Sequence, residues 1–217
     1  TAAYANNQPR HDKLIRFLGD LETQIEADTS WFAVIHADGN GLGQIFQNFG
    51  KHLQASDAGT AMTLRKYALG YRHFSDAIER CTSAAFRQAI TVFGETPKIV
   101  PLILGGDDLT VVCDGEYGLA FAHEYLTAFA AETQKDNVIS SIVGAASGAS
   151  GLTACAGIAF VKPHFPFHAA YDLAEDLCKS AKEVKKSVAP ACALDFHVIF
   201  DSTPINLDHI RAHASFG

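Results

Sequence analysis

One segment of the chain constrains the fold more than any other. Two apolar runs, residues 98–104 and 109–113, flank the sequence Gly-Gly-Asp-Asp at residues 105–108. Short apolar runs separated by a turn that opens with glycine predict a β-hairpin, here with a four-residue turn. Pro101 has no N–H group to donate to a ladder, so we expect a bulge in the first strand. Two adjacent aspartates should therefore stand at the tip of this hairpin.

A third aspartate follows another apolar run. Residues 31–37 are short, apolar and partly β-branched, as in a buried strand, and the run ends at Asp38. The next residues form a glycine-rich turn, and a helix is expected to begin near Leu42. In a palm fold this strand lies beside the hairpin. Asp38, Asp107 and Asp108 should then meet at one edge of the sheet.

The rest of the sequence alternates between helical and extended patterns. Hydrophobic spacing and breaker residues predict five further helices, two further strands and one surface loop of small residues. The helices are expected at residues 12–25, 60–90, 116–133 and 168–187, the loop at 140–151, the strands at 152–161 and 192–200, and a last helix from about Asn206.

This order of elements predicts an α+β fold. We expect a ferredoxin-like palm domain of the nucleotidyl cyclase or polymerase type, with added helices. Its sheet should be antiparallel or mixed and carry its helices on one face. Residues 1–30 are interpreted as an N-terminal helical extension and residues 31–217 as the palm domain.

Charge and cysteine content narrow the function classes. The formal net charge is −7, from 17 Lys plus Arg against 24 Asp plus Glu, which argues against an extended nucleic-acid surface. The 5 cysteines include no Cys-x-x-Cys pair and are read as reduced thiols of a cytoplasmic protein. No apolar run is long enough to span a membrane. A small charged ligand such as a nucleotide remains compatible with this balance.

Three clustered carboxylates favour a metal site. They ionise together at neutral pH only if cations compensate their charge, and Mg²⁺ or Mn²⁺ prefers oxygen ligands. Two such ions about 3.5–4 Å apart serve the transfer of phosphoryl groups. Gly-Gly-Asp-Asp alone is also a common exposed turn. Its combination with Asp38 at a second strand end favours the catalytic interpretation of Asp38, Asp107 and Asp108.

The residues around the carboxylates suit a nucleotide. Glycines let the backbone approach phosphate groups, and the helix start after Gly41 offers N–H groups to an anion. Lys179 and Lys182 are three residues apart and share a helix face, which either borders the phosphates or is simply solvated. The expected nucleotide-binding set is Gly39, Asn40, Gly41, Leu42, Gly43, Gly105, Gly106, Lys179 and Lys182.

Four motifs in order resemble a known family. Phe32-Ala-Val-Ile-His-Ala-Asp-Gly-Asn-Gly-Leu-Gly43, Gly105-Gly-Asp-Asp108, Cys155-Ala-Gly-Ile-Ala-Phe160 and Ala193-Leu-Asp-Phe-His-Val-Ile199 are similar to the second palm domain of the type III CRISPR large subunit. Ala181-Lys182 more distantly resembles the end of the signature helix of GGDEF cyclases.

The resemblance implies an activity and residue roles. It implies that ATP is converted to a cyclic oligoadenylate messenger in antiviral signalling, with two Mg²⁺ or Mn²⁺ ions as cofactors. It also implies that Asp38, Asp107, Asp108 and the carbonyl of Gly39 ligate the metals, and that Lys182 holds the triphosphate.

Other functions stay open at this point. A single palm offers one donor site, so we expect a homodimer or a second palm domain to supply the opposing surface. A nucleotide cyclase or cyclic-dinucleotide synthase would use the same metals. A catalytically silent palm, kept as a nucleotide-binding or scaffold domain of a ribonucleoprotein, is the alternative from a different class.

Overall fold

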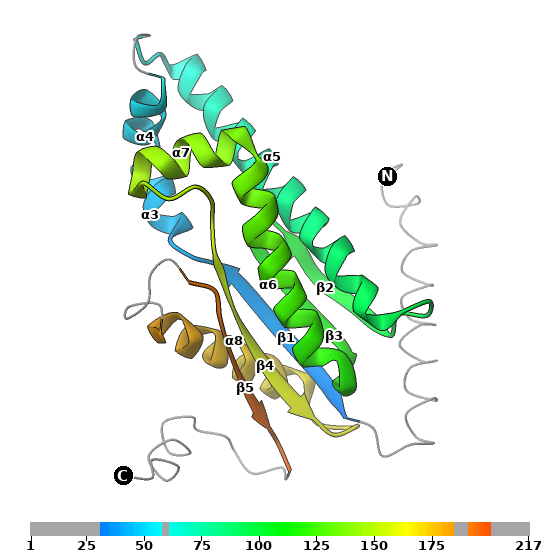
Figure 1. Cartoon of the computed structure of the whole chain (residues 1–217). Coiled ribbons are helices and arrows are strands. Elements are labelled where there is room, and N and C mark those ends of the chain that lie inside the picture. The colour runs from blue at the N-terminus through cyan, green and yellow to red at the C-terminus, as the bar shows by residue number, and fades with distance from the viewer. Residues whose placement is uncertain (1–30, 58–60, 185–190, 201–217) are drawn as a thin grey trace, which may run out of the picture.

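The protein is built around a five-stranded mixed sheet with the strand order β2-β3-β1-β4-β5 (Figure 1). The computed structural model describes residues 31–57, 61–184 and 191–200. The strands are β1 (Phe32–Gly39), β2 (Ile99–Gly105), β3 (Asp108–Asp114), β4 (Ala154–Val161) and β5 (Ala193–Val198). β4 and β5 are parallel, and all other neighbouring strands are antiparallel. The predicted α+β palm architecture with a mixed sheet is confirmed.

Helices connect these strands. They are α3 (Leu42–Gln47), α4 (Phe49–Ser56), α5 (Leu64–Ala89), α6 (Gly118–Lys135), α7 (Asn137–Ser147) and α8 (Phe167–Val184), with 3-10 turns η1 (Ile90–Phe93) and η2 (Gly115–Tyr117). The helices predicted at residues 12–25 and near Asn206 lie outside the described residues. Within the described ranges, no helix is both long enough and apolar enough to cross a membrane.

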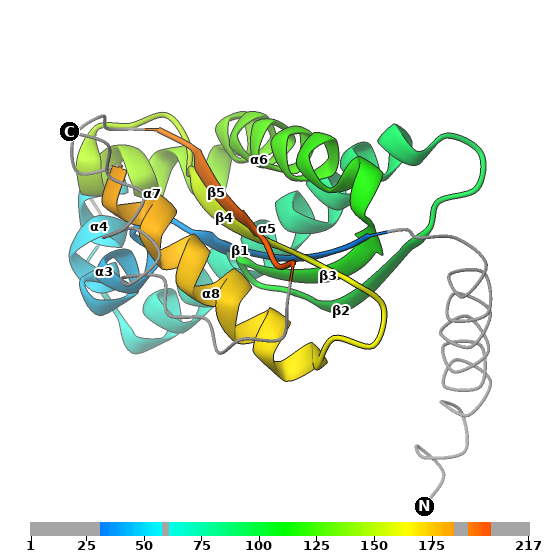
Figure 2. The ribbon, with the colours of Figure 1, turned by 90° about the horizontal axis from the view of Figure 1, so that it is seen from below.

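Helices cover both faces of the sheet, whereas the sequence predicted one face. Figure 2 shows α6 and α8 on opposite sides of the strands. Alternate residues of β1 divide accordingly: Ile35 belongs to the large core with α5 and α6, and Val34 packs with α8 in a second cluster. Every residue of β4 is buried, as expected for a strand covered on both faces.

The segment predicted as a loop at residues 140–151 is largely helix α7. Its N-cap Asp136 accepts hydrogen bonds from the backbone N–H groups of Val138 and Ile139. Ile139, Ile142 and Val143 are buried at helical spacing, and Gly148 ends the helix with a φ of 75°. The prediction was wrong because small residues were read as flexible, although the apolar side chains among them follow a helical period.

The hairpin differs from the prediction in its turn. Gly105 pairs with Asp108, so the turn has only two central residues, Gly106 and Asp107. Of these two residues, Gly106 has a positive φ, at 59°, and Asp107 does not. A glycine with positive φ is typical of the tight turns that join antiparallel strands. The predicted bulge is confirmed by a register shift between Pro101 and Ile103. The hairpin tip therefore lies directly beside the end of β1.

Candidate metal and nucleotide site

The end of β1 places Asp38 on the face of the sheet that α8 covers. Asp38 pairs with Cys155 of β4, and the register of β1 with β3 reaches Ala37 opposite Leu109. Residues directly opposite each other point to the same face. Asp38 and Asp108 therefore project from neighbouring strands toward the same side of the sheet edge.

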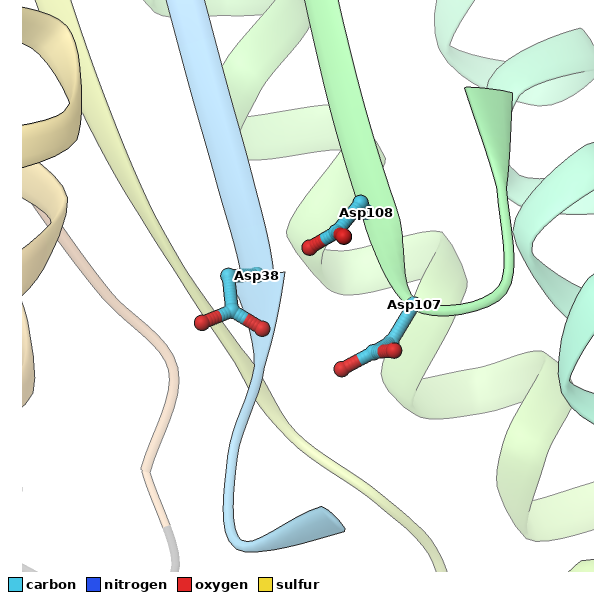
Figure 3. Close-up of side chains that lie close together, drawn as sticks. All are labelled: Asp38, Asp107 and Asp108. Atoms are coloured by element: carbon cyan, nitrogen blue, oxygen red, sulfur yellow. The ribbon is translucent and has the colours of Figure 1, made fainter. Parts of the chain in front are cut away.

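The three predicted carboxylates converge in the structure. Figure 3 shows Asp38 at the end of β1 facing Asp107 and Asp108 at the hairpin tip. Each of the three contributes a carboxylate oxygen to a group whose members all lie within 4.8 Å of one another. Asp38 and Asp107 are partly buried and Asp108 is exposed. Hard oxygen donors at this separation fit Mg²⁺ or Mn²⁺.

The carboxylates disturb one another electrostatically. Burial raises the pKa of Asp107 to about 6, its own backbone amide opposes that shift, and Asp38 and Asp108 add to it. Burial also raises the pKa of Asp108, with a further contribution from the charge of Asp38. Both shifts have the cause expected for like charges gathered in a partly desolvated place. A divalent cation would relieve this repulsion.

Lys182 is the cation that reaches the cluster. It comes from the last turns of α8, and its ammonium group forms an ion pair with Asp38. The same ammonium group lies 3.5 Å from the backbone carbonyl oxygen of Gly39. The structure thus brings three predicted site residues, Lys182, Asp38 and Gly39, into direct contact.

Lys179 does not join this group. Its ammonium group contacts the carboxylates of Glu175 and Asp176 on its own helix, each at 3.1 Å, and its side chain is 62% exposed. Of the two lysines predicted to bind the nucleotide, Lys182 therefore lies at the carboxylates and Lys179 does not. Residues three apart differ by about 60° around a helix, which is enough to separate them here.

Gly39 allows the hairpin to approach β1 closely. A Cβ atom at this position would lie 2.6 Å from Leu42 Cδ1 and 2.9 Å from both Asp107 Cβ and Asp107 Oδ2. A side chain would therefore push Asp107 away from Asp38. Leu42 itself is a buried core residue, so its part in the site is to pack beneath Gly39.

The other predicted nucleotide-binding residues lie around the start of α3. Gly41 is its N-cap, and the helix has only 6 residues before α4 begins. Gly43 is exposed on the first turn of α3, Gly105 ends β2, and Gly106 is a central residue of the hairpin turn. A Cβ atom at Gly41, Gly43, Gly105 or Gly106 would meet no atom within 4 Å, so the space at these four positions is open.

Asn40 and Gly41 line a cavity of about 400 Å³ between α3, α4 and α7. Asn40 is 8% exposed, and its amide group donates to Thr153 Oγ1 at 3.0 Å and to the carbonyl of Ala191 at 3.4 Å. Its Oδ1 atom has no hydrogen-bond partner in the described part of the chain. Asn40, a wall residue of this cavity two positions after Asp38, therefore carries a buried acceptor without a partner.

Comparison with known families decides the relationship. The family model for Cas10/Cmr2, second palm domain, matches residues 31–189. The chain belongs to this family. No curated protein matches the sequence.

Solved structures show similar chains at low identity. A chain of a Csm1-Csm4 cassette in complex with cA4 is 18% identical, with a TM-score of 0.44, and the match covers 73% of this chain and 20% of that one. A chain of a cassette in complex with AMPPNP is 19% identical, with a TM-score of 0.44 and coverages of 74% and 21%. This Cas10/Cmr2 palm thus spans about a fifth of the length of the chains it matches.

Sequence reasoning missed two residues of this palm's site. His36 lies on the same face as Asp38, with Nδ1 3.1 Å from Thr110 Oγ1 and its ring against Tyr171, and burial lowers its pKa. Thr82 of α5 donates a 2.6 Å hydrogen bond to the carbonyl of Gly106. The sequence signal for Thr82 was its polar side chain among the apolar residues that form the buried face of α5.

Proposed function

We propose that this palm domain is a metal-dependent nucleotidyl transferase. It converts ATP to a cyclic oligonucleotide, a cyclic oligoadenylate or a cyclic dinucleotide, and releases pyrophosphate, in CRISPR-like antiviral signalling in the cytoplasm. The observation that carries the proposal is the cluster of Asp38, Asp107 and Asp108 at one edge of the sheet. Membership in the Cas10/Cmr2 palm family supports ATP as the substrate class.

The metal site is assigned to these three carboxylates and the carbonyl of Gly39. Two Mg²⁺ or Mn²⁺ ions held there would supply charge stabilisation for the transferred phosphoryl group and would lower the pKa of the attacking hydroxyl. Asp38 and Asp108 would contribute oxygen ligands from β1 and β3. The third ligand, Asp107, can approach β1 closely because Gly39 has no side chain. The raised pKa values of Asp107 and Asp108 fit the assignment, because burial, which is the larger cause, and the charge of Asp38 both disfavour the ionised carboxylates until a cation binds.

Lys182 has two partners in this proposal. In the structure it neutralises Asp38. When cations take over that role, its ammonium group is free to turn toward the triphosphate as a point charge. Asn40 and Gly41 at the neighbouring cavity, with Gly43, Gly105 and Gly106 around the edge, are proposed to contact the remainder of the nucleotide.

A second palm surface is needed for the acceptor nucleotide. The described residues contain one carboxylate cluster, so one chain binds one donor triphosphate. We propose that a second copy of this chain or another palm domain faces this edge. Light scattering with and without ATP tests this point, and turnover by a strict monomer would contradict it.

Product analysis tests the activity. The protein is incubated with each nucleoside triphosphate and Mg²⁺ or Mn²⁺, and the products are identified by mass spectrometry. The expected result is a cyclic adenylate with pyrophosphate release from wild type, and none from the Asp107→Ala/Asp108→Ala variant. Equal product from the variant would refute the assignment of the carboxylates.

One observation favours a silent palm as the second candidate. Lys182 compensates Asp38, and the raised pKa of Asp107 favours its neutral form, so the chain lowers the charge of the cluster without metal. A scaffold or nucleotide-binding domain of a ribonucleoprotein would then keep the geometry without turnover. Metal-dependent ATP binding in the absence of any product, with or without a second palm, would favour this candidate.

A further inference from the structure

We propose that Thr82 is a positioning residue that holds the metal-binding turn through the Gly106–Asp107 peptide. This inference rests on the proposed function, since it assigns a role toward the same three carboxylates. Thr82 lies on α5, in the helical layer beneath the sheet, and its own side chain does not belong to the cluster. It acts through the turn that carries Asp107 and Asp108.

The contact joins two distant parts of the chain. Thr82 Oγ1 donates to the carbonyl oxygen of Gly106 at 2.6 Å, across 24 residues of sequence. Thr82 is 0% exposed. A hydroxyl buried to this degree is held by its partner, because leaving it unpaired costs more free energy than the bond itself contributes.

The bonded carbonyl controls the orientation of Asp107. The C=O of Gly106 and the N–H of Asp107 belong to one planar peptide unit, so fixing one fixes the other. Gly106 is a residue with φ of 59° and no side chain, and without an anchor its peptide can rotate at low cost. The hydrogen bond from Thr82 removes that freedom at the residue that precedes the first carboxylate of the turn.

The turn needs an anchor more than Asp38 does. Asp38 ends the central strand β1, which is paired with β3 on one side and β4 on the other. The hairpin is paired on one side only, because β2 is an edge strand. The distance between Asp38 and the other two carboxylates therefore depends mainly on how the hairpin tip is held.

A purely structural role would not require the hydroxyl group. The other buried residues of α5 are Phe74, Ala77, Ile78, Cys81, Ala85, Phe86 and Ala89, and Thr82 is the polar exception. Valine has nearly the same shape and would fill this position in an ordinary core. The Thr82 hydroxyl also neighbours the buried phenol of Tyr125, and its 2.6 Å bond is made to the carbonyl of the turn.

Three variants of the full chain separate positioning from stability. Thr82→Val removes the hydroxyl at nearly constant volume, and Thr82→Ser retains it. Thr133→Val is the matched control, because Thr133 is also 0% exposed and its Oγ1 bonds the backbone of Leu152, away from the carboxylates. Thermal unfolding of all three confirms that they fold and reports the stability each has lost.

Mn²⁺ affinity, measured by electron paramagnetic resonance of free Mn²⁺, is the first readout. Thr82→Val should weaken binding about fivefold, the size expected for the net loss of one hydrogen bond of about 1 kcal/mol. Thr82→Ser should bind like wild type, and Thr133→Val should lose stability without losing affinity. Wild-type affinity in Thr82→Val, or an equal loss in Thr133→Val, would overturn the proposal.

Amide hydrogen exchange of residues 105–108 in metal-free protein is the second readout. Thr82→Val should speed exchange at the turn, and Thr133→Val should not. If wild type binds no Mn²⁺, the proposed metal site fails, and the exchange data still decide whether Thr82 holds the turn. Unchanged exchange in Thr82→Val would refute the positioning role whatever the metal result.

Discussion

Two acidic regions of this palm handle charge in opposite ways. In the groove between α5 and α6, Asp136 caps α7 and lies 3.1 Å from Arg80, and Glu132 lies 2.7 Å from Lys135. At the carboxylate edge, three aspartates have Lys182 as their cationic partner within the described residues. The first region pairs Asp136 and Glu132 with basic neighbours, and the second leaves net negative charge for a ligand to neutralise.

The comparison shows why counting acidic residues is a poor guide to a metal site. The groove contains four acidic and three basic side chains around a cavity of about 650 Å³. The edge contains fewer acids, yet the pKa values of Asp107 and Asp108 are raised. Compensation by neighbours, and not the number of carboxylates, separates a structural acidic region from a candidate site.

The largest expected difference between the two regions is in activity. Asp108→Ala should reduce turnover about 10³-fold or more, because metal ligation contributes several kcal/mol and about 1.4 kcal/mol corresponds to tenfold. Asp136→Ala should leave turnover near wild type and destabilise the fold by about 1–2 kcal/mol, through the lost cap and the lost ion pair. Steady-state kinetics and thermal unfolding measure both. The reverse pattern would assign the structural role to the edge.

The next largest difference is expected between substitutions of two lysines of α8, Lys182 and Lys179. Lys182→Ala should lower kcat/KM for ATP about 10- to 100-fold, mainly through KM, as expected for losing a charged contact to phosphate. Lys179→Ala should have little effect, since Lys179 is exposed and paired within its own helix. Kinetics at saturating Mg²⁺ provide the test. Equal effects of both substitutions would point to a general electrostatic field instead of a contact.

A smaller effect is expected at Gly39. Gly39→Ala places a methyl group against Leu42 and Asp107, and overpacking of this kind costs about 1–3 kcal/mol. Metal affinity should fall because Asp107 is displaced. Gly144→Ala in α7 is the control, because a Cβ there meets nothing closer than 3.8 Å. Calorimetric titration with Mn²⁺ compares the two, and unchanged affinity in Gly39→Ala would count against the close approach.

The smallest effect is a pH dependence of stability. The pKa of Asp107 is about 6 in the folded protein, above its ordinary value of 3.8, so the folded state binds more protons between these values. The contribution of Asp107 to the free energy of unfolding is therefore largest below pH 4 and is lost as the pH rises through 6. Mn²⁺ should raise Tm more at pH 7.5 than at pH 5. Asp107→Asn should lack this difference, and an equal response in both proteins would exclude Asp107 as its source.

Much of the fold follows from sequence patterns that are local. The apolar runs predicted β1 and the hairpin, and Pro101 predicted the bulge. The family-typical order of motifs predicted which strand ends meet. Helix α7 was misread because composition was weighed above the spacing of Ile139, Ile142 and Val143.

The remaining features depend on tertiary geometry. Sequence spacing treats Lys179 and Lys182 alike, and only the docking of α8 against β1 and β4 separates them. Whether α8 lies on the face of α6 or opposite it depends on the crossover between β4 and β5, which no single residue specifies. The bond from Thr82 to Gly106 spans two elements that the sequence does not link.

The central claim is that the edge of the sheet binds divalent cations, because Lys182 alone does not neutralise its three carboxylates. The most direct measurement is the stoichiometry and affinity of Mn²⁺ for wild type, Asp107→Ala/Asp108→Ala and Asp136→Ala, with ATP present. We predict about two ions per wild-type chain, the same for Asp136→Ala, and a loss of binding in the double variant. Undiminished binding in the double variant would place the metals elsewhere and contradict the account.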